Sequence, residues 1–188
     1  MIRCPWCLSH PLYIDYHDNE WGKPLHDDRR LFELLILEGA QAGLSWLTVL
    51  KKRENYRKAF DGFDAQKIAQ YGPRKVKSLL ADVGIIRNRL KIAAAIDNAK
   101  VTLALRKERG SLDAYLWSFV GEKTIINHPK TMKDIPAKSK ISDAMSKDLK
   151  ARGFRFAGST ICYAFMQAAG LVDDHLSDCY LRKRNARS

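Results

Sequence analysis

The stretch Leu79-Leu80-Ala81-Asp82-Val83-Gly84-Ile85-Ile86-Arg87-Asn88-Arg89-Leu90-Lys91-Ile92 decides the fold. Its pattern is that of a helix-hairpin-helix, in which a tight turn at Gly84 joins two helices. Backbone N–H groups at the start of the second helix, together with the helix dipole, would form a phosphate site that ignores base sequence. Three basic residues lie close enough to reinforce it: Arg87, Arg89 and Lys91. An ordinary αα-corner is the alternative, because Ile86 stands where such hairpins usually have a second glycine.

The rest of the chain also has a helical pattern, with no convincing alternating strands. Capping residues, prolines and glycines mark where helices should begin and end. The expected helices cover 27–38, 45–60, 64–72, 73–84, 88–107, 112–119, 142–152 and 159–169. Residues 121–139, which include Pro129 and Pro136, form a long loop. These signals predict an all-α fold in a single domain, residues 1–188, with a disordered tail at 181–188.

Basic residues outnumber acidic ones in this chain. Lys and Arg total 33 and Asp and Glu total 21, which gives a net charge of +12. Such an excess favours a polyanionic partner, nucleic acid first and an acidic membrane second. The alternative is a soluble protein whose basic surface is merely solvated.

Hydropathy and cysteine content indicate the cellular compartment in which the protein is expected. No apolar stretch is long enough to span a membrane, because charges interrupt each one within about ten residues. Nothing at the start resembles a secretory signal, since Trp, Cys and Pro stand where an apolar core is required. Four cysteines without export indicate a reducing compartment, where disulfides are rare. We therefore expect a cytoplasmic monomer with no membrane attachment.

Residues that bind metals lie near both ends of the chain. Cys4 and His17 form C-x12-H, and His175 and Cys179 form H-x3-C. The second pair is four residues apart and would share one helical face or one tight turn. If the pairs converge, one zinc ion joins the ends, because loop closure costs about 4–5 kcal/mol and structural zinc supplies about 10–16 kcal/mol. The alternative is that these residues serve unrelated core or surface roles.

Cys7 adds a second possibility at the start of the chain. Cys4-Pro-Trp-Cys7 is a C-x2-C that would suit a metal or a redox dithiol. A thioredoxin-like site follows a strand and opens a helix, but this one begins four residues into the chain with no strand before it. The redox interpretation is therefore disfavoured. Cys162, in an apolar segment, is expected to be a buried and inert thiol.

Glu38 follows an apolar run, 31–37, and precedes a segment rich in small residues. Its carboxylate is either the solvated end of a helix or a charge aimed into a pocket, since carboxylates are seldom buried without a partner. Aromatic residues favour the pocket, although core packing is their default role. Five of them lie near Glu38 or near the start of the chain: Trp6, Tyr13, Tyr16, Trp21 and Trp46. Aromatic walls with one carboxylate suit a planar cationic base.

These segments closely resemble the 3-methyladenine DNA glycosylase I family. The resemblance is carried by Asp15-Tyr16-His17-Asp18-Asn19-Glu20-Trp21-Gly22, Leu37-Glu38-Gly39-Ala40-Gln41-Ala42-Gly43-Leu44-Ser45-Trp46, Gly84-Ile85-Ile86-Arg87 and Thr160-Ile161-Cys162-Tyr163. It runs from Cys4 to Cys179, nearly the whole chain. It implies an all-helical DNA-repair glycosylase of the helix-hairpin-helix superfamily. We expect two helical lobes, one of 1–60 with 142–188 tied by zinc and one of 61–120 that carries the hairpin.

The resemblance also implies an activity and a set of site residues. The activity would be base-excision repair, by hydrolysis of the N-glycosidic bond of 3-methyladenine in alkylated double-stranded DNA. The catalytic residues would be Glu38 and Tyr16, and the base would be bound by Tyr13, Trp46, Trp6 and Trp21. The residues that probe the duplex would be Gln41 and Leu44, and the DNA backbone would be held by Gly84, Ile85 and Arg87. One structural zinc per chain would be held by Cys4, His17, His175 and Cys179, which leaves Cys7 spare. Ala164 departs from members with a small hydroxyl side chain there.

Methylation at N3 makes adenine cationic and a good leaving group, so the enzyme's main tasks are extruding the base, identifying it and stabilising charge on the sugar. Related glycosylases carry an aspartate after the hairpin. Asp97 is the nearest here, but it lies inside a basic helix and is expected at the surface. No lysine occupies a Schiff-base position near the hairpin, so the strand should stay intact. Two alternatives are a noncatalytic helix-hairpin-helix DNA binder and a zinc-dependent dithiol protein using Cys4 and Cys7.

Overall fold

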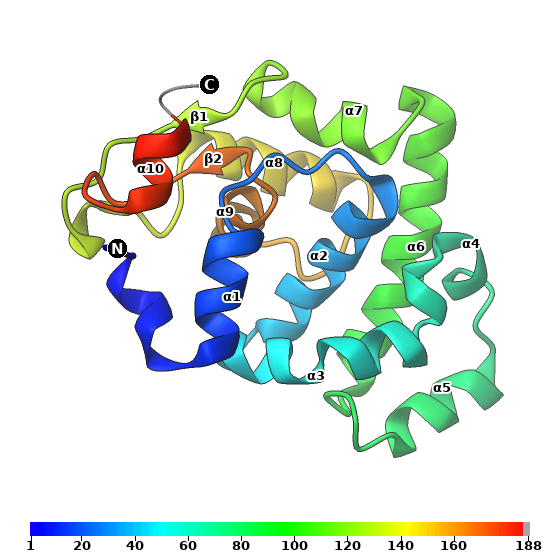
Figure 1. The fold of residues 1–188 in the computed structure, drawn as a ribbon. Coiled ribbons are helices and arrows are strands. Elements are labelled where there is room, and N and C mark those ends of the chain that lie inside the picture. Colours follow the sequence, from blue (N-terminus) through cyan, green and yellow to red (C-terminus); the bar gives the residue numbers. More distant parts are fainter. Residues whose placement is uncertain (186–188) are drawn as a thin grey trace.

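The computed structural model describes residues 1–185 and is mostly helical (Figure 1). The α-helices are α1 (Pro11–Asn19), α2 (Asp28–Gln41), α3 (Trp46–Ala59), α4 (Ala65–Ile68), α5 (Pro73–Ala81), α6 (Arg89–Arg109), α7 (Leu112–Trp117), α8 (Lys140–Ala151), α9 (Ser159–Ala168) and α10 (Tyr180–Asn185). Short 3-10 helices lie at η1 (Pro5–Ser9), η2 (Asp61–Phe63), η3 (Ser118–Val120) and η4 (Met132–Asp134). None of the helices within residues 1–185 is both long and apolar enough to cross a membrane. The prediction of a mostly helical chain is confirmed.

Helix α2 passes through the middle of the molecule (Figure 1). Every residue from Leu31 to Ala40 is buried, so the helix is enclosed on all sides rather than on one stripe. It contacts α3, α6, α7 and α9. We expected Gly39 to break the helix, but it lies inside it. A small residue is needed at this position, because an added Cβ would lie 3.1 Å from Phe156 Cβ. This glycine serves close packing, and the helix ends only after Gln41.

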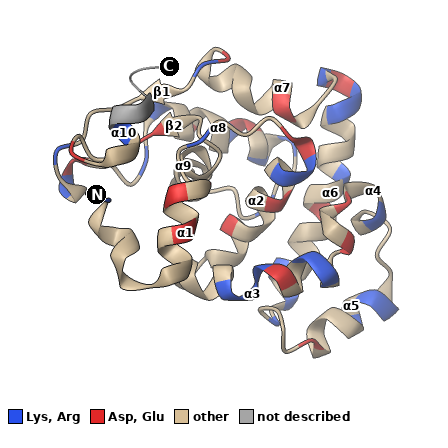
Figure 2. Cartoon of the chain, in the orientation of Figure 1, with Lys and Arg blue, Asp and Glu red and all other residues tan. Residues whose placement is uncertain are grey.

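Helices α5 and α6 are joined by residues 82–88, which we call the hairpin. The first helix ends at Ala81, and the side chain of Asn88 caps the second by accepting the Lys91 N–H at 3.1 Å. Gly84 is required by close approach, because an added Cβ would lie 2.9 Å from Asp82 Oδ1 and 3.0 Å from Asn55 Cβ. Basic residues lie on α3 and at the start of α5 (Figure 2), and the Lys52 ammonium on α3 donates to the Val83 carbonyl of the hairpin at 2.9 Å. The expected pair of helices with a tight turn at Gly84 is therefore present.

The two ends of the chain lie together. The Tyr180 N–H donates to the Ile2 carbonyl at 2.9 Å. Strands β1 (Ile125–Ile126) and β2 (Val172–Asp173) pair in parallel, with Ile125 opposite Val172, so the fold is not purely α. The expected long loop 121–139 is thus fixed to the C-terminal segment at several points, including the Pro129 carbonyl, which accepts the Ser177 N–H at 2.9 Å.

The prediction of a disordered tail beginning at residue 181 is wrong at its start. Leu181 and Arg182 are buried, and both belong to α10. The Arg182 guanidinium donates to Nδ1 of His128 in the 121–139 loop at 2.8 Å. Packing against that loop orders this part of the chain. Residues 186–188 lie outside the described part of the chain.

Candidate active site

A cavity of about 250 Å³ lies between α1, the end of α2, the start of α3 and α9. All six predicted pocket residues line it: Trp6, Tyr13, Tyr16, Trp21, Glu38 and Trp46. Gln41 and Ala164 line it too. Residues from both ends of the chain are therefore brought to one concave site whose size is near that of small-molecule pockets.

Aromatic rings form the wall of this cavity. The ring of Trp6 packs edge-on against Tyr13 at 5.6 Å between centroids and against Trp21 at 5.1 Å. The Tyr16 and Trp46 rings lie 5.6 Å apart, tilted by 55°. The Tyr13 hydroxyl accepts the Leu47 N–H at 2.9 Å, which ties α1 to α3. These contacts fix the rings in place before any ligand enters.

Glu38 is the one acidic residue on the cavity lining, and its side chain is 4% exposed. Within residues 1–185 no hydrogen bond or ion pair reaches its carboxylate. Burial raises the pKa of Glu38 from 4.5 to about 8. A buried carboxylate without a partner is costly, and such perturbed groups cluster at functional sites. Of the two alternatives for Glu38, the structure supports a charge aimed into a pocket.

Tyr16 and Trp46 lie beside this carboxylate. Burial, and then the charge of Glu38, raise the pKa of the Tyr16 hydroxyl well above its ordinary value, so this tyrosine stays neutral. The Trp46 indole Nε1 is buried and has no hydrogen-bond partner among residues 1–185. A ligand in the cavity would therefore find a carboxylate and an indole N–H that the protein leaves unpaired.

Gln41 and Leu44 lie at the edge of this cavity. A neighbouring hollow of about 200 Å³ is lined by both residues and shares Glu38 and Ala164 with the first cavity. Leu44 is 41% exposed, so its side chain is open to contact at this edge. The turn that carries it has Gly43 at φ +79, where an L side chain would be strained. The role of these two residues in probing the duplex stays a prediction.

Three further residues that line the cavity were not expected from the sequence. Met132 and Ile135 reach it from the 121–139 loop, and Gln167 reaches it from α9. The Gln167 Nε2 donates to Asp174 Oδ2 at 2.7 Å, and the same oxygen accepts the Tyr163 hydroxyl at 2.8 Å. A capping box formed by Thr131 and Asp134 predicts the short helix η4 within this loop. It does not indicate that the loop contacts a pocket built from other parts of the chain.

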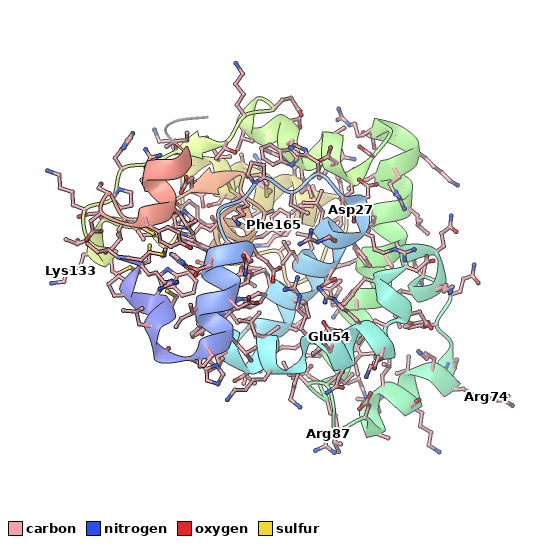
Figure 3. All side chains as sticks on the ribbon, in the orientation of Figure 1. Asp27, Glu54, Arg74, Arg87, Lys133 and Phe165 are labelled. Carbon is pink, nitrogen blue, oxygen red and sulfur yellow. The ribbon has the colours of Figure 1, made fainter. Side chains whose placement is uncertain are left out.

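The hairpin uses some of its backbone donors internally. The Gly84 N–H donates to Asp82 Oδ1 at 2.7 Å, and the Ile85 N–H donates to the Asp82 carbonyl at 3.4 Å. Within residues 1–185, no acceptor is bonded to the N–H groups of Val83 and Arg87 in the hairpin or of Arg89 and Leu90 at the start of α6. The Arg87 side chain projects from the edge of the molecule (Figure 3). A phosphate at the hairpin would meet these groups.

Lys91 does not reinforce the hairpin surface as expected. Its ammonium donates to the carbonyl oxygens of Ala40 and Ala42, both at 2.7 Å. These carbonyls lie at the end of α2, where a helix leaves acceptors unsatisfied. The sequence did not show this contact, because it joins segments about fifty residues apart.

Three of the four predicted metal ligands converge. The ligand atoms of Cys4, His17 and Cys179 lie within 4.8 Å of one another, and all three residues are buried. His17 Nε2 is 3.5 Å from Cys179 Sγ, and its Nδ1 bonds to Asp18 at 2.8 Å. Hydrogen bonds from Cys4 and His17 lower the pKa of the Cys179 thiol, so the thiolate form is favoured.

His175 lies beside this cluster without belonging to the set of three. Its ring centroid is 5.0 Å from that of His17, and its Nδ1 bonds to Asp173 Oδ1 at 2.7 Å. Its Nε2 is buried with no hydrogen-bond partner in the described chain. Both histidines therefore have Nδ1 bonded to a carboxylate, while Nε2 of His17 faces the Cys179 sulfur and Nε2 of His175 has no partner in the described chain. A carboxylate on Nδ1 is the usual arrangement of histidine ligands that bind a metal through Nε2.

Cys7 takes no part in the cluster. It is buried, and its thiol donates to the Cys4 carbonyl at 3.1 Å. A redox dithiol needs a partly exposed thiol of lowered pKa, whereas burial raises the pKa of Cys7. Cys162 is buried too, with its pKa raised to about 12, as expected for an inert core thiol.

Comparison with known proteins gives the same family throughout. A family model described as methyladenine glycosylase matches residues 6–183. DNA-3-methyladenine glycosylase of Haemophilus influenzae is 52% identical over 177 residues, which are 94% of this chain and 96% of that protein. A crystal structure of 3-methyladenine DNA glycosylase I has a TM-score of 0.93 at 52% identity, covering 95% of this chain and 98% of that one. A structure of the Staphylococcus aureus enzyme, on 3-methyladenine recognition, has a TM-score of 0.92 at 39% identity, covering 95% of each chain.

Proposed function

The chain belongs to the methyladenine glycosylase family, and we propose that the cavity around Glu38 is where it binds 3-methyladenine. Its function is that of a DNA-3-methyladenine glycosylase, a base-excision-repair enzyme that hydrolyses the N-glycosyl bond of the damaged nucleotide. The observation that carries the site assignment is an unpaired, buried carboxylate inside a cage of aromatic rings.

Glu38 recognises the positive charge of the methylated base. Burial raises the pKa of its carboxyl to about 8, so the group is largely protonated near neutral pH. A cationic base in contact lowers that pKa again, because an opposite charge favours the ionised form. The carboxylate then accepts hydrogen bonds from the base. An uncharged adenine lacks this gain in free energy, which is the source of selectivity for the alkylated purine.

Tyr16 and the rings around it orient the base. The neutral Tyr16 hydroxyl lies beside Glu38 and can donate to the base or to the carboxylate. Trp46 stacks on the purine, and its unpaired Nε1 offers one further donor at the cavity wall. Ala164 lines the same cavity and brings no hydroxyl, so its part of the wall is apolar.

The reaction breaks the bond between the base nitrogen and the sugar C1′. The electron pair stays with the base, which neutralises its charge. A water oxygen bonds to C1′ and loses one proton to the solvent, which leaves a hydroxyl on the sugar. Little help from a general acid is needed, because the cationic base is already a good leaving group. Asp97 plays no part, since it is exposed and paired with Arg155 at 3.0 Å. No amine nucleophile is involved, so the DNA strand stays intact.

DNA is held at the hairpin in the manner of a helix-hairpin-helix. The free N–H groups at the start of α6 and the Arg87 side chain meet phosphates without reading bases. Gly84 and Ile85 shape the turn, and their own N–H groups stay bonded to Asp82. Gln41 and Leu44, at the mouth of the cavity, enter the space that the extruded base leaves. The net charge of +12 assists association with duplex DNA.

Cys4, His17, His175 and Cys179 suit one structural zinc ion. Their donor types are those zinc prefers, and the unpaired Nε2 of His175 beside the other three supports a fourth ligand. The metal, when bound, would join the two ends of the chain and take no part in the reaction. We further propose that the protein acts as a cytoplasmic monomer.

The decisive experiment incubates the protein with methylated duplex DNA, identifies any free base by chromatography and examines the strand on a denaturing gel. The proposal predicts free 3-methyladenine and an intact strand. A noncatalytic DNA binder would bind the duplex and release no base. A dithiol protein would require Cys7 and would be indifferent to Glu38, so Cys7→Ser and Glu38→Gln variants separate that alternative from a glycosylase.

A further inference from the structure

Lys91 ties the hairpin to the segment that carries the base cavity. It lies in the first turn of α6, directly after residues 82–88. Its backbone N–H donates to Asn88 Oδ1 at 3.1 Å, while its ammonium donates to the Ala40 and Ala42 carbonyls, both at 2.7 Å. One residue thus holds the start of α6 and the end of α2 together.

The end of α2 leads directly to the cavity. Ala40 lies two residues after Glu38, and Ala42 begins the turn that continues to Leu44 and then to Trp46. Carbonyls at the end of a helix are unsatisfied and carry the negative end of its dipole, so a lysine ammonium is a suitable partner. The contact therefore fixes the backbone between two residues of the cavity wall, Glu38 and Trp46.

The ammonium of Lys91 is positioned to bond the Ala40 and Ala42 carbonyls rather than a DNA phosphate. Two of its protons are committed to backbone carbonyls, and burial lowers its pKa. The side chain also lines a cavity of about 20 Å³ together with Gly39, Ile86 and Ile92. A space of that size holds about one water molecule, so the inner side of the Lys91 side chain is closely packed.

We propose that Lys91 is a positioning residue for base excision, which keeps the base cavity and the 41–44 turn in register with the hairpin. The inference rests on the proposed function, in which the hairpin holds phosphates while the cavity receives the base. Lys91 touches neither base nor phosphate. Without its ammonium the two parts stay folded, but the distance between the held backbone and the cavity is less well defined. Poor placement of reacting groups slows a reaction without abolishing binding.

The test compares Lys91→Met with Lys100→Met, which removes the same charge from an exposed position on the same helix. Four quantities are measured: single-turnover release of 3-methyladenine at saturating enzyme, salt dependence of undamaged-duplex binding, affinity for free 3-methyladenine, and the melting temperature. For Lys91→Met we expect release to slow about tenfold or more, because two hydrogen bonds from a charged donor are lost. Its melting temperature should fall, because the same two hydrogen bonds stabilise the fold, while its salt dependence and its affinity for free 3-methyladenine should match the unsubstituted protein. All four quantities for Lys100→Met should match the unsubstituted protein.

Three results would overturn the inference. Normal release by Lys91→Met means that the tie is unimportant. A salt slope reduced by about 0.9 means that Lys91 contacts a phosphate instead. A fall in free-base affinity together with the melting temperature means that Lys91 has a general structural role. If Lys91→Met does not fold, Lys91→Gln, with a shorter side chain that keeps a hydrogen-bond donor, repeats the test. Failure of the unsubstituted protein to release base would refute the proposed function, and is thereby distinguished from failure of this inference.

Discussion

Replacing Glu38 with glutamine should change how stability depends on pH. The substitution keeps the shape of the side chain and removes its titration. In the folded protein burial raises the pKa of Glu38 from 4.5 to about 8. Below the unfolded pKa both states are protonated, so the group has no pH-dependent effect. As pH rises toward the folded pKa, the unfolded chain ionises while the folded protein stays protonated, and the folded state loses stability.

The size of this loss follows from the pKa values. The shift from 4.5 to about 8 is 3.5 units, and at 1.36 kcal/mol per unit it amounts to about 5 kcal/mol. The loss should accumulate between pH 4.5 and pH 8 and then level off. The cost of burying the glutamine amide does not change with pH. The difference between the two proteins therefore isolates the carboxyl group, and Glu38→Gln should become progressively more stable than the unsubstituted protein across this window.

The assay is urea unfolding of both proteins at intervals from about pH 5 to pH 9, with the difference in unfolding free energy plotted against pH. Glu122→Gln is the matched control, because Glu122 is exposed and its variant should show a flat difference. The proposed metal site is the same in all three proteins, so its contribution cancels in the difference. A flat difference for Glu38→Gln would mean that Glu38 is ionised and partnered in the folded state, which refutes the reasoning.

Three further predictions concern the metal site and the DNA grip. Cys4→Ser should lose zinc and lower the melting temperature sharply, whereas Cys7→Ser should keep its zinc by elemental analysis; zinc lost from the second variant would overturn the ligand set. Gly22→Ala should also lose zinc and stability, because its φ is +74 and an added Cβ would lie 2.7 Å from His175 Cε1. Arg87→Ala should weaken binding equally on all duplexes and reduce the salt slope by about 0.9. Unchanged affinity and slope would place the DNA path elsewhere.

Local signals in the sequence predicted where helices begin. Ser45, Asp64 and Asn88 were expected to start helices, and each accepts a backbone N–H from the first turn of α3, α4 or α6. Capping is a local interaction, so it can be read from a few residues. The predicted end of α2 was wrong, because Gly39 allows close packing against Phe156 and does not end the helix. No local sequence pattern reveals that contact.

Some residues of the candidate site could be predicted from the sequence, and others could not. The carboxylate of Glu38 and the rings around it were found because family resemblance and residue type both indicated them. The wall formed by Met132 and Ile135 was missed, since it depends on how the C-terminal segment holds the 121–139 loop. Lys91 was assigned to the hairpin surface from its spacing, but a flexible lysine side chain can turn either way. Only the position of the Ala40 and Ala42 carbonyls decides its direction.

The central claim is that Glu38 meets the positive charge of the damaged base, and single-turnover release of 3-methyladenine by Glu38→Gln tests it most directly. Buried hydrogen bonds to a charged group are worth about 1.5–3 kcal/mol, which corresponds to about a ten- to hundredfold loss in excision. Affinity for undamaged duplex should stay the same, because the phosphates are held at the hairpin. We expect this selective loss from a variant that is still folded. Normal release from folded Glu38→Gln would contradict it.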